Sequence, residues 1–233
     1  MKLLRVFTLL GLLLASHAQA VTWFPTQKVD PIDGQTLRVK VWASYGSYVY
    51  REPSRSDLVF FPITEPNWLW FSEDSGYGAF GNDYDKLAPE EAAAIKDWLA
   101  QHYSKKLKLK TQVDRLAWVE QIYALRKKDA RFWRGFYCLM AYMTREDAAR
   151  SLGYVNKALP LLEQELAANP QGEARMDVLY LLGEYHRRNG RLEKAQDYFE
   201  QVGKVTWTNS KGEAKIGQPY FDALIKERLA LGQ

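Results

Sequence analysis

The chain has 233 residues, of which 47% are hydrophobic and 26% charged, and its formal net charge is only +4. Because so small a charge gives little long-range attraction to polyanions, the composition argues against nucleic acid or an anionic membrane as the partner. Eight tryptophans and fourteen tyrosines favour a folded protein with a sizeable core over a disordered one.

Residues 1–20 have the pattern of a secretory signal peptide. Lys2 and Arg5 give a positively charged start, a short apolar stretch follows, and a small-x-small cleavage motif ends at Ala20. The apolar stretch is shorter than the roughly 20 residues that span a bilayer. We therefore expect cleavage after Ala20, no stable membrane insertion, and a periplasmic or secreted product. Loss of Lys2 and Arg5 lowers the net charge from +4 to +2.

Residues 21–87 predict a small β-rich head. The segment is aromatic and β-branched, and glycine and proline interrupt it repeatedly, which is typical of short strands and turns. Residues 37–42 alternate apolar and polar side chains, as a half-buried strand does, and residues 57–61 and 68–71 are shorter apolar runs.

Two turns in this head have the spacing of metal-binding knuckles without the cysteines. Asp30 and Asp33 precede Gly34, and Ser72 and Ser75 precede Gly76, so each pair keeps the two-residue gap and the trailing glycine of a C-x-x-C knuckle. A structural zinc ion needs four good nitrogen or sulfur ligands in a tetrahedron. We therefore interpret the head as a degenerate, zinc-ribbon-like framework with four vestigial knuckle positions, and we predict no metal and no cofactor.

Two further interpretations concern what holds these turns. We expect aromatic packing to replace the contribution of the metal, and the side chains that could provide it are Trp68, Trp70, Phe71 and Tyr77. The alternative is a site for a hard ion such as calcium, whose carboxylate ligands would be Asp30, Asp33, Glu73 and Asp74. The chain has no EF-hand spacing, which counts against that alternative.

Residues 88–233 predict an all-helical domain. Pro89 at a first helical position, followed by Glu90 and Glu91, marks the first helix, whose apolar positions recur at helical spacing as far as His102. Further helices fit residues 112–127, 130–144, 154–168, 174–189, 191–204 and 217–231. Pro160 predicts a kink or a later start in the third of these. We interpret the basic stretch 105–110 as a solvated connector.

Cys138 is the only cysteine, so the chain forms no internal disulfide. It lies in an apolar helical run, whereas a catalytic thiolate requires a cationic and partly open environment. We interpret Cys138 as a small buried hydrophobic residue.

Residues 176–202 carry a pattern typical of a tetratricopeptide (TPR) repeat. The positions that match its residue types are Leu179, Leu182, Gly183, Gly190, Ala195 and Phe199. In such repeats the first helix lines a concave binding face. On this helix, the candidate partner-binding residues are Asp177, Tyr180, Glu184, Arg187 and Arg188. A TPR-like pair used only for packing remains an equal alternative, because about three repeats are needed for a stable array.

The order of these features resembles the bacterial domain-of-unknown-function family 2225, in which a ribbon of cysteine knuckles leads into a helical, TPR-like tail. The matching stretches are residues 30–34, 55–58, 75–80, 84–89, 180–185, 188–190 and 195–199. The resemblance implies an α+β fold with a ribbon-like head and a TPR-like tail, and it implies no defined activity. The chain departs from that family at the four knuckle positions, where thiolates are replaced.

No catalytic signature is present, and His102 and His186 each fall on a predicted helix face. The leading functional hypothesis is an exported, non-catalytic interaction or scaffold protein of the cell envelope, which binds a protein or peptide in the helical groove. A second hypothesis is an envelope glycan-binding module, for instance for peptidoglycan, whose aromatic platform would contain Tyr45, Tyr48, Tyr50, Trp68 and Trp70. A third is an enzyme with an unrecognised site.

Overall fold

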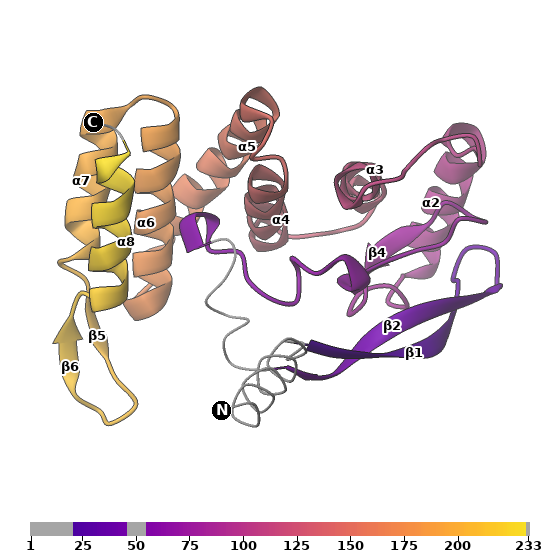
Figure 1. The fold of residues 1–233 in the computed structure, drawn as a ribbon, viewed down its shortest axis with the longest axis horizontal. Helices are drawn as coiled ribbons and strands as arrows, with labels where there is room; N and C mark the ends of the chain where they lie inside the picture. Colours follow the sequence, from indigo (N-terminus) through magenta and orange to yellow (C-terminus); the bar gives the residue numbers. More distant parts are fainter. Residues whose placement is uncertain (1–20, 46–54, 232–233) are drawn as a thin grey trace, which may run out of the picture.

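The computed structural model describes residues 21–45 and 55–231. The predicted signal peptide lies outside these residues, as do Tyr48 and Tyr50 of the aromatic platform. The described part has an α+β fold, with small antiparallel strand pairs and α-helices. In Figure 1 the strands of the head lie at one end of the longest axis, and α6, α7 and α8 lie at the other.

The elements follow one another as short strands and then helices. The head contains β1 (Val21–Val29), β2 (Thr36–Tyr45), the 3-10 turns η3 (Arg55–Asp57) and η4 (Pro66–Trp68), β3 (Leu69–Phe71) and β4 (Gly78–Phe80). The helices are α2 (Pro89–His102), α3 (Gln112–Ala124), α4 (Ala130–Met143), α5 (Ala148–Ala167), α6 (Gly172–Arg188), α7 (Leu192–Val202) and α8 (Pro219–Ala230), with β5 (Thr206–Thr208) and β6 (Ala214–Ile216) between the last two.

A long hairpin, β1–β2, lies along one side of the head. Its strands pair antiparallel, with Thr26 opposite Val39. Val39 is buried, so one face of the hairpin packs on the rest of the head. The Trp70 indole N–H donates a hydrogen bond of 3.2 Å to the Lys40 carbonyl, which connects this hairpin to β3.

Helix α3 packs on β4, and Trp98 of α2 packs on Trp118 of α3. The Phe80 backbone N–H donates a 3.0 Å hydrogen bond to the Tyr123 hydroxyl oxygen, which connects β4 to α3. Arg126 is buried just after α3 and faces Asp83 and Glu91 at 3.4 and 3.6 Å. The first two helices therefore belong to the packing of the head, and one continuous cluster of buried side chains joins it to α8.

The tail is made of two helix pairs and a final helix. α4 packs on α5, α6 on α7, and α8 against α6. Gly183 allows the close approach of α6 and α7, because a Cβ atom at this position would lie only 2.5 Å from the Phe199 ring.

Three local predictions were wrong. The third of the further helices begins at Ala148 instead of 154, because the Asp147 carboxylate caps it by accepting from the Arg150 N–H. Residues 57–61 form a 3-10 turn and irregular chain instead of a strand. The β5–β6 hairpin lies in a region that we predicted to be all-helical. The Trp207 indole N–H stabilises it by donating a hydrogen bond to the Gly217 carbonyl.

Candidate functional site

All five residues of the predicted groove lie on α6, but they do not form an open surface. Tyr180 and Glu184 are buried, with exposed fractions of 0% and 2%. Arg187 donates two hydrogen bonds to the Glu184 carboxylate, at 2.7 and 2.9 Å, so its charge is already paired. The prediction that this face is open to a partner therefore needs correction, whereas partner binding itself stays a prediction.

The face of α6 that carries Tyr185 and Arg188 is covered by the protein's own chain. We call residues 56–63, which follow the head hairpin, the docked segment. The η3 turn at its start contacts α4, α6 and α8, and Figure 1 shows η3 between α6 and α4. Of the five predicted groove residues, Arg188 is bonded to the docked segment, whereas Tyr180 packs on Phe199 of α7 and Phe221 of α8.

Asp57 anchors the docked segment. Its carboxylate is 2.8 Å from the Arg188 guanidinium and accepts a 3.0 Å hydrogen bond from the Tyr185 hydroxyl. The same guanidinium donates to the Ser151 hydroxyl oxygen at 2.5 Å, so residues from η3, α5 and α6 meet in one network. Burial raises the pKa of the Asp57 carboxyl, although the Arg188 charge and the Tyr185 hydroxyl oppose that shift. No local sequence pattern predicts this role of Asp57, because its partner Arg188 lies 131 positions away.

A small cavity of about 190 Å³ lies beside this network, between the docked segment and α4 and α6. Cys138 is on its wall, together with Leu58, Phe60 and Arg134. Burial raises the pKa of the Cys138 thiol to about 11, so it is protonated at neutral pH. This placement is that of a buried small hydrophobic residue rather than a reactive thiolate.

Asp177 lies in the first half of α6 and is partly buried. Among the described residues, no group donates a hydrogen bond to its carboxylate. Loss of hydration raises the pKa of this carboxyl to about 6, while the positive charge of Arg134 opposes the shift. Because the unfolded carboxyl titrates near 3.8, the folded protein binds the proton more tightly between about pH 4 and 6. Stability therefore falls as pH rises through this window.

We expect Asp177→Asn to raise the free energy of unfolding at pH 7 by roughly 2 kcal/mol, and to change it little at about pH 3.5, where both side chains are neutral. Urea unfolding at the two pH values measures this difference. Asp197→Asn, on the exposed side of α7, controls for the loss of one carboxylate. An equal gain from the two variants at pH 7 would contradict the burial argument.

The two predicted knuckles form turns with the same hydrogen bonds. In the first, the Gly34 N–H donates to the Asp30 carbonyl at 2.9 Å, and the Asp30 N–H donates to the Gln35 carbonyl at 2.8 Å. In the second, the Gly76 N–H donates to the Ser72 carbonyl at 2.9 Å, and the Ser72 N–H donates to the Tyr77 carbonyl at 2.8 Å. Gly34 and Gly76 both have positive φ angles, 74° and 79°, which explains the trailing glycine of each turn.

Side chains of the two turns meet directly. The Ser75 hydroxyl donates a 2.7 Å hydrogen bond to one Asp30 carboxylate oxygen, and the other oxygen accepts from the Ile32 N–H at 2.8 Å. The Ser75 oxygen in turn accepts from the Tyr77 N–H at 3.0 Å. Asp30 is 1% exposed, so this buried carboxylate depends on these donors.

The comparisons with known proteins give one match. The model of a family described as an uncharacterized protein conserved in bacteria (DUF2225) matches residues 59–218. The chain belongs to this family. No curated protein and no solved structure shows a significant match to the chain. The resemblance noted in the sequence is thereby confirmed, and the match includes the second knuckle but not residues 21–58.

The metal that a cysteine ribbon would hold does not fit this DUF2225 chain. Ser72 and Ser75 accept hydrogen bonds from backbone N–H groups, and Asp33 accepts one from Gln35 N–H, so these oxygens already have donors. Within residues 21–45 and 55–231, no three His, Cys, Asp or Glu side chains are grouped as metal ligands. Asp30 and Ser75 instead join the two turns by a direct hydrogen bond.

We expect Ser75→Ala to lower the free energy of unfolding by about 1–3 kcal/mol, because it removes a donor from the buried Asp30 carboxylate. A metal chelator should leave the melting temperature of the wild type unchanged. Thermal unfolding with and without the chelator, together with elemental analysis, measures both effects. Ser104→Ala, in the exposed α2–α3 loop, serves as the control. Stoichiometric zinc or calcium in the purified protein would contradict the hydrogen-bonded account.

The aromatic residues of the head are mostly packed inside it. Trp70 is buried, and the Trp68 ring is half-buried with its centroid 4.3 Å from that of Trp42. Tyr77 is fully buried beside Tyr84, 4.9 Å between ring centroids, close to the second knuckle. These positions favour core packing over a glycan platform, and glycan binding itself stays a prediction.

The two histidines occupy different environments. His102 is exposed near the end of α2 and stacks on Trp98, with 4.7 Å between ring centroids. His186 is buried in α6 and stacks on Tyr198. Burial and the nearby Lys194 charge lower the pKa of His186.

In the part of the chain that the structure describes, no helix is long and apolar enough to cross a membrane.

Proposed function

We propose that this chain is an exported, non-catalytic interaction protein of the bacterial cell envelope, whose TPR-like tail binds an acidic segment of a partner protein. The observation that carries the proposal is the docked segment on the inner face of the tail. A face that holds a buried carboxylate against Arg188 offers the same contacts to a partner that displaces this segment.

The arrangement of the helices supports the TPR-like interpretation. In TPR arrays the first helix of each pair lines the concave face. Here the first helices of the two pairs are α4 and α6, and α8 would be the first helix of a third pair. These are the three helices that η3 contacts. The close approach at Gly183 and the positive φ of 72° at Gly190, just after α6, agree with the roles of these glycines in such repeats.

The head would act as a brace in this proposal. We infer that its two turns are the knuckles of a degenerate zinc ribbon, since both keep the spacing, the glycine and the backbone hydrogen bonds. The Ser75–Asp30 hydrogen bond would replace the metal as the connection between them. Export follows from the signal-peptide pattern of residues 1–20, and a chain with a single cysteine is suited to an oxidising compartment.

Position-specific photo-crosslinking in intact cells tests the proposal. Benzoylphenylalanine replaces Gly135, a half-buried residue of α4 that lines the cavity under the docked segment and where a Cβ would meet nothing within 4 Å. A matched probe replaces Gln196, on the exposed side of α7. Each crosslinked product is digested, and the attached peptides are identified by mass spectrometry.

We expect an adduct with an acidic segment of one envelope protein at position 135 and none at position 196. Adducts at both positions, or only with the protein's own docked segment at position 135, would count against a partner in this groove. Cell fractionation of the same strains tests the location separately, since a cytoplasmic protein would contradict export.

A further inference from the structure

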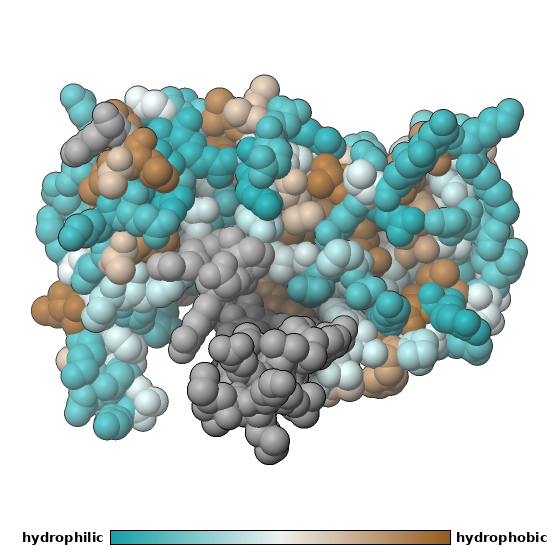
Figure 2. Space-filling model, viewed as in Figure 1, coloured by the Kyte–Doolittle hydropathy of each residue, from teal (hydrophilic) through white to brown (hydrophobic). Residues whose placement is uncertain are grey.

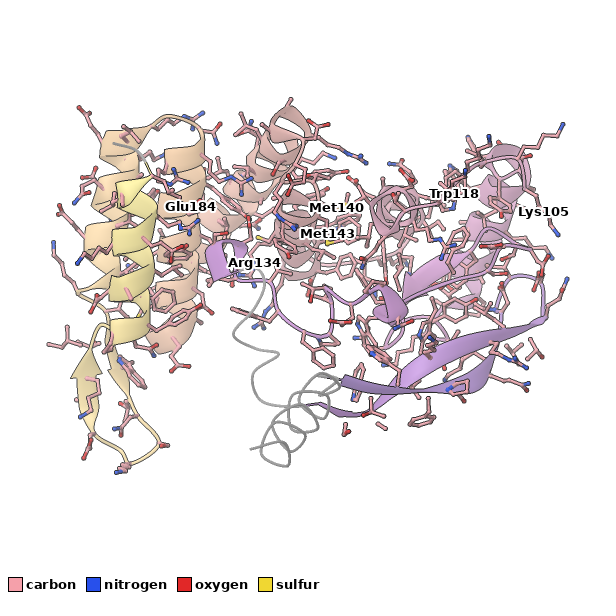
Figure 3. All side chains as sticks on the ribbon, viewed as in Figure 1. Lys105, Trp118, Arg134, Met140, Met143 and Glu184 are labelled. Atoms are coloured by element: carbon pink, nitrogen blue, oxygen red, sulfur yellow. The ribbon has the colours of Figure 1, made fainter. Side chains whose placement is uncertain are left out.

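A second concave site lies at the other end of the molecule. It is a pocket of about 420 Å³ between the second knuckle and the loop that joins α2 to α3, residues 103–111. Figure 3 places Lys105, which lines this pocket, at the opposite end from Glu184 on α6. The pocket is therefore separate from the groove of the tail, and its function does not depend on the proposal made for that groove.

The lining of this pocket carries more positive than negative charge. Its two carboxylates are already paired, Glu73 with Arg115 at 3.0 Å and Asp74 with Lys105 at 2.6 Å. Lys108 and Lys110 also line the pocket, and neither has an ion pair within the described ranges. Two exposed ammonium groups therefore remain for a ligand of negative charge. In Figure 2 the end of the molecule that carries this loop is largely hydrophilic.

The pocket walls are held in place without a ligand. The Arg115 Nε–H donates to the Leu109 carbonyl at 3.1 Å, and its guanidinium lies 5.3 Å from the centre of the Phe71 ring. The Tyr103 hydroxyl donates to the Glu73 carbonyl at 2.7 Å, which attaches the start of the loop to the second knuckle. Because these groups are already ordered, a ligand would lose less free energy in fixing them.

Size and chemistry together define a ligand class. The volume lies within the range of small-molecule sites. Two free ammonium groups match the charge of a phosphate monoester, about −1.5 to −2 at neutral pH. The Phe71 and Tyr103 rings and the leucines of the loop add apolar surface for the group that carries the phosphate. Leu107, 41% exposed, stands among the lysines of this loop.

We propose that this pocket binds a phosphate group through Lys108 and Lys110, with Arg115 holding the pocket wall. The phosphate belongs either to a small soluble phosphate ester or to the headgroup of an anionic phospholipid. In the second case the exposed Leu107 would enter the interface beside the lysines, as apolar residues do in basic segments that bind membrane surfaces.

Two titrations of the full chain distinguish these sources. Isothermal calorimetry with glycerol 3-phosphate tests the soluble ligand. Flotation with phosphatidylcholine vesicles, with and without phosphatidylglycerol, tests the headgroup. The test variant is Lys108→Ala/Lys110→Ala, whose exposed side chains make no ion pair in the described structure. The matched control is Lys204→Ala/Lys211→Ala, which removes the same charge from an exposed region near the β5–β6 hairpin.

We expect the test variant to weaken binding about 25-fold, or fivefold for each lysine, and the control to bind like the wild type. Binding of glycerol 3-phosphate assigns the soluble source, and binding only to vesicles with phosphatidylglycerol assigns the headgroup. No binding in either arm would overturn the proposal, as would equal losses in the test and control variants.

Discussion

Arg188→Ala should lower the free energy of unfolding by about 3–5 kcal/mol, which is the largest effect that we expect from a single change in this protein. The substitution removes the cation that faces the Asp57 carboxylate. Asp57 is only 4% exposed, and the Tyr185 hydroxyl would be its remaining strong hydrogen-bond donor. The substitution also removes the donor to Ser151. Chemical denaturation of the purified protein measures the loss.

The loss should depend on pH in a defined direction. Burial already raises the pKa of Asp57, and removing the opposing Arg188 charge raises it further. A carboxyl whose folded pKa lies above its unfolded value loses stability as pH rises through the interval between them. Arg188→Ala should therefore be less costly in acid, as the folded Asp57 takes up its proton, than at pH 7.

Two comparisons identify the cause. Arg131→Ala removes an exposed arginine from α4 and should change stability by less than about 0.5 kcal/mol. Asp57→Ala combined with Arg188→Ala should cost less than the sum of the single changes, because the double variant leaves neither charge buried alone. Additive losses, or an Arg188→Ala loss no larger than that of Arg131→Ala, would refute the buried ion pair.

Arg188→Ala also tests whether Asp57 anchors the docked segment. If Asp57 holds the docked segment in place, then Arg188→Ala should speed hydrogen exchange at residues 56–63 more than at β4, which lies in the core of the head. Uniform acceleration over the whole chain would mean that the pair stabilises the fold without anchoring the segment in particular.

The sequence predicted the elements of the tail better than their contacts. Apolar spacing and a proline at position 89 gave α2 its limits, and most other helix ends were within a few residues of those observed. The start of α5 was missed because the helix, capped by Asp147, begins at Ala148, six residues before the predicted start. Of the two outcomes predicted from Pro160, a later start is wrong, since the helix includes this residue, and a kink stays a prediction.

The candidate site was predictable only in part, for a physical reason. A repeat pattern places five side chains on one face of α6, but it contains no information on which distant segment covers that face. The Asp57–Arg188 contact joins residues 131 positions apart and depends on how the head docks on the tail. The knuckles are the opposite case, because a two-residue gap and a glycine with positive φ are local features that the sequence itself records.

Gly76→Ala should lower the free energy of unfolding by about 2–5 kcal/mol. Part of this loss is backbone strain, about 1–2 kcal/mol, because the residue has a φ of 79°. The rest, about 1–3 kcal/mol, is overpacking, since the new Cβ would lie 2.2 Å from the Tyr103 ring. Thermal or urea unfolding measures the total.

Gly34→Ala is a matched control within the same molecule. Gly34 occupies the equivalent place in the first knuckle with a φ of 74°, but a Cβ there would meet nothing within 4 Å. It should therefore show the strain without the overpacking, and the difference between the two variants isolates the contact with Tyr103. In a Tyr103→Ala background that difference should disappear, and its persistence would show that the ring is not the cause.

The Gly76 variant also links the fold to the proposed phosphate pocket. Tyr103 is a wall of that pocket, and its hydroxyl is bonded to the Glu73 carbonyl in the same knuckle. A side chain at position 76 must displace the Tyr103 ring. Gly76→Ala should therefore weaken binding of the ligand that the wild type binds, whether this is glycerol 3-phosphate or phosphatidylglycerol vesicles. Gly34→Ala should leave that binding unchanged. Equal binding by both folded variants would mean that Tyr103 does not shape the site, and the lysines alone would then have to account for the affinity.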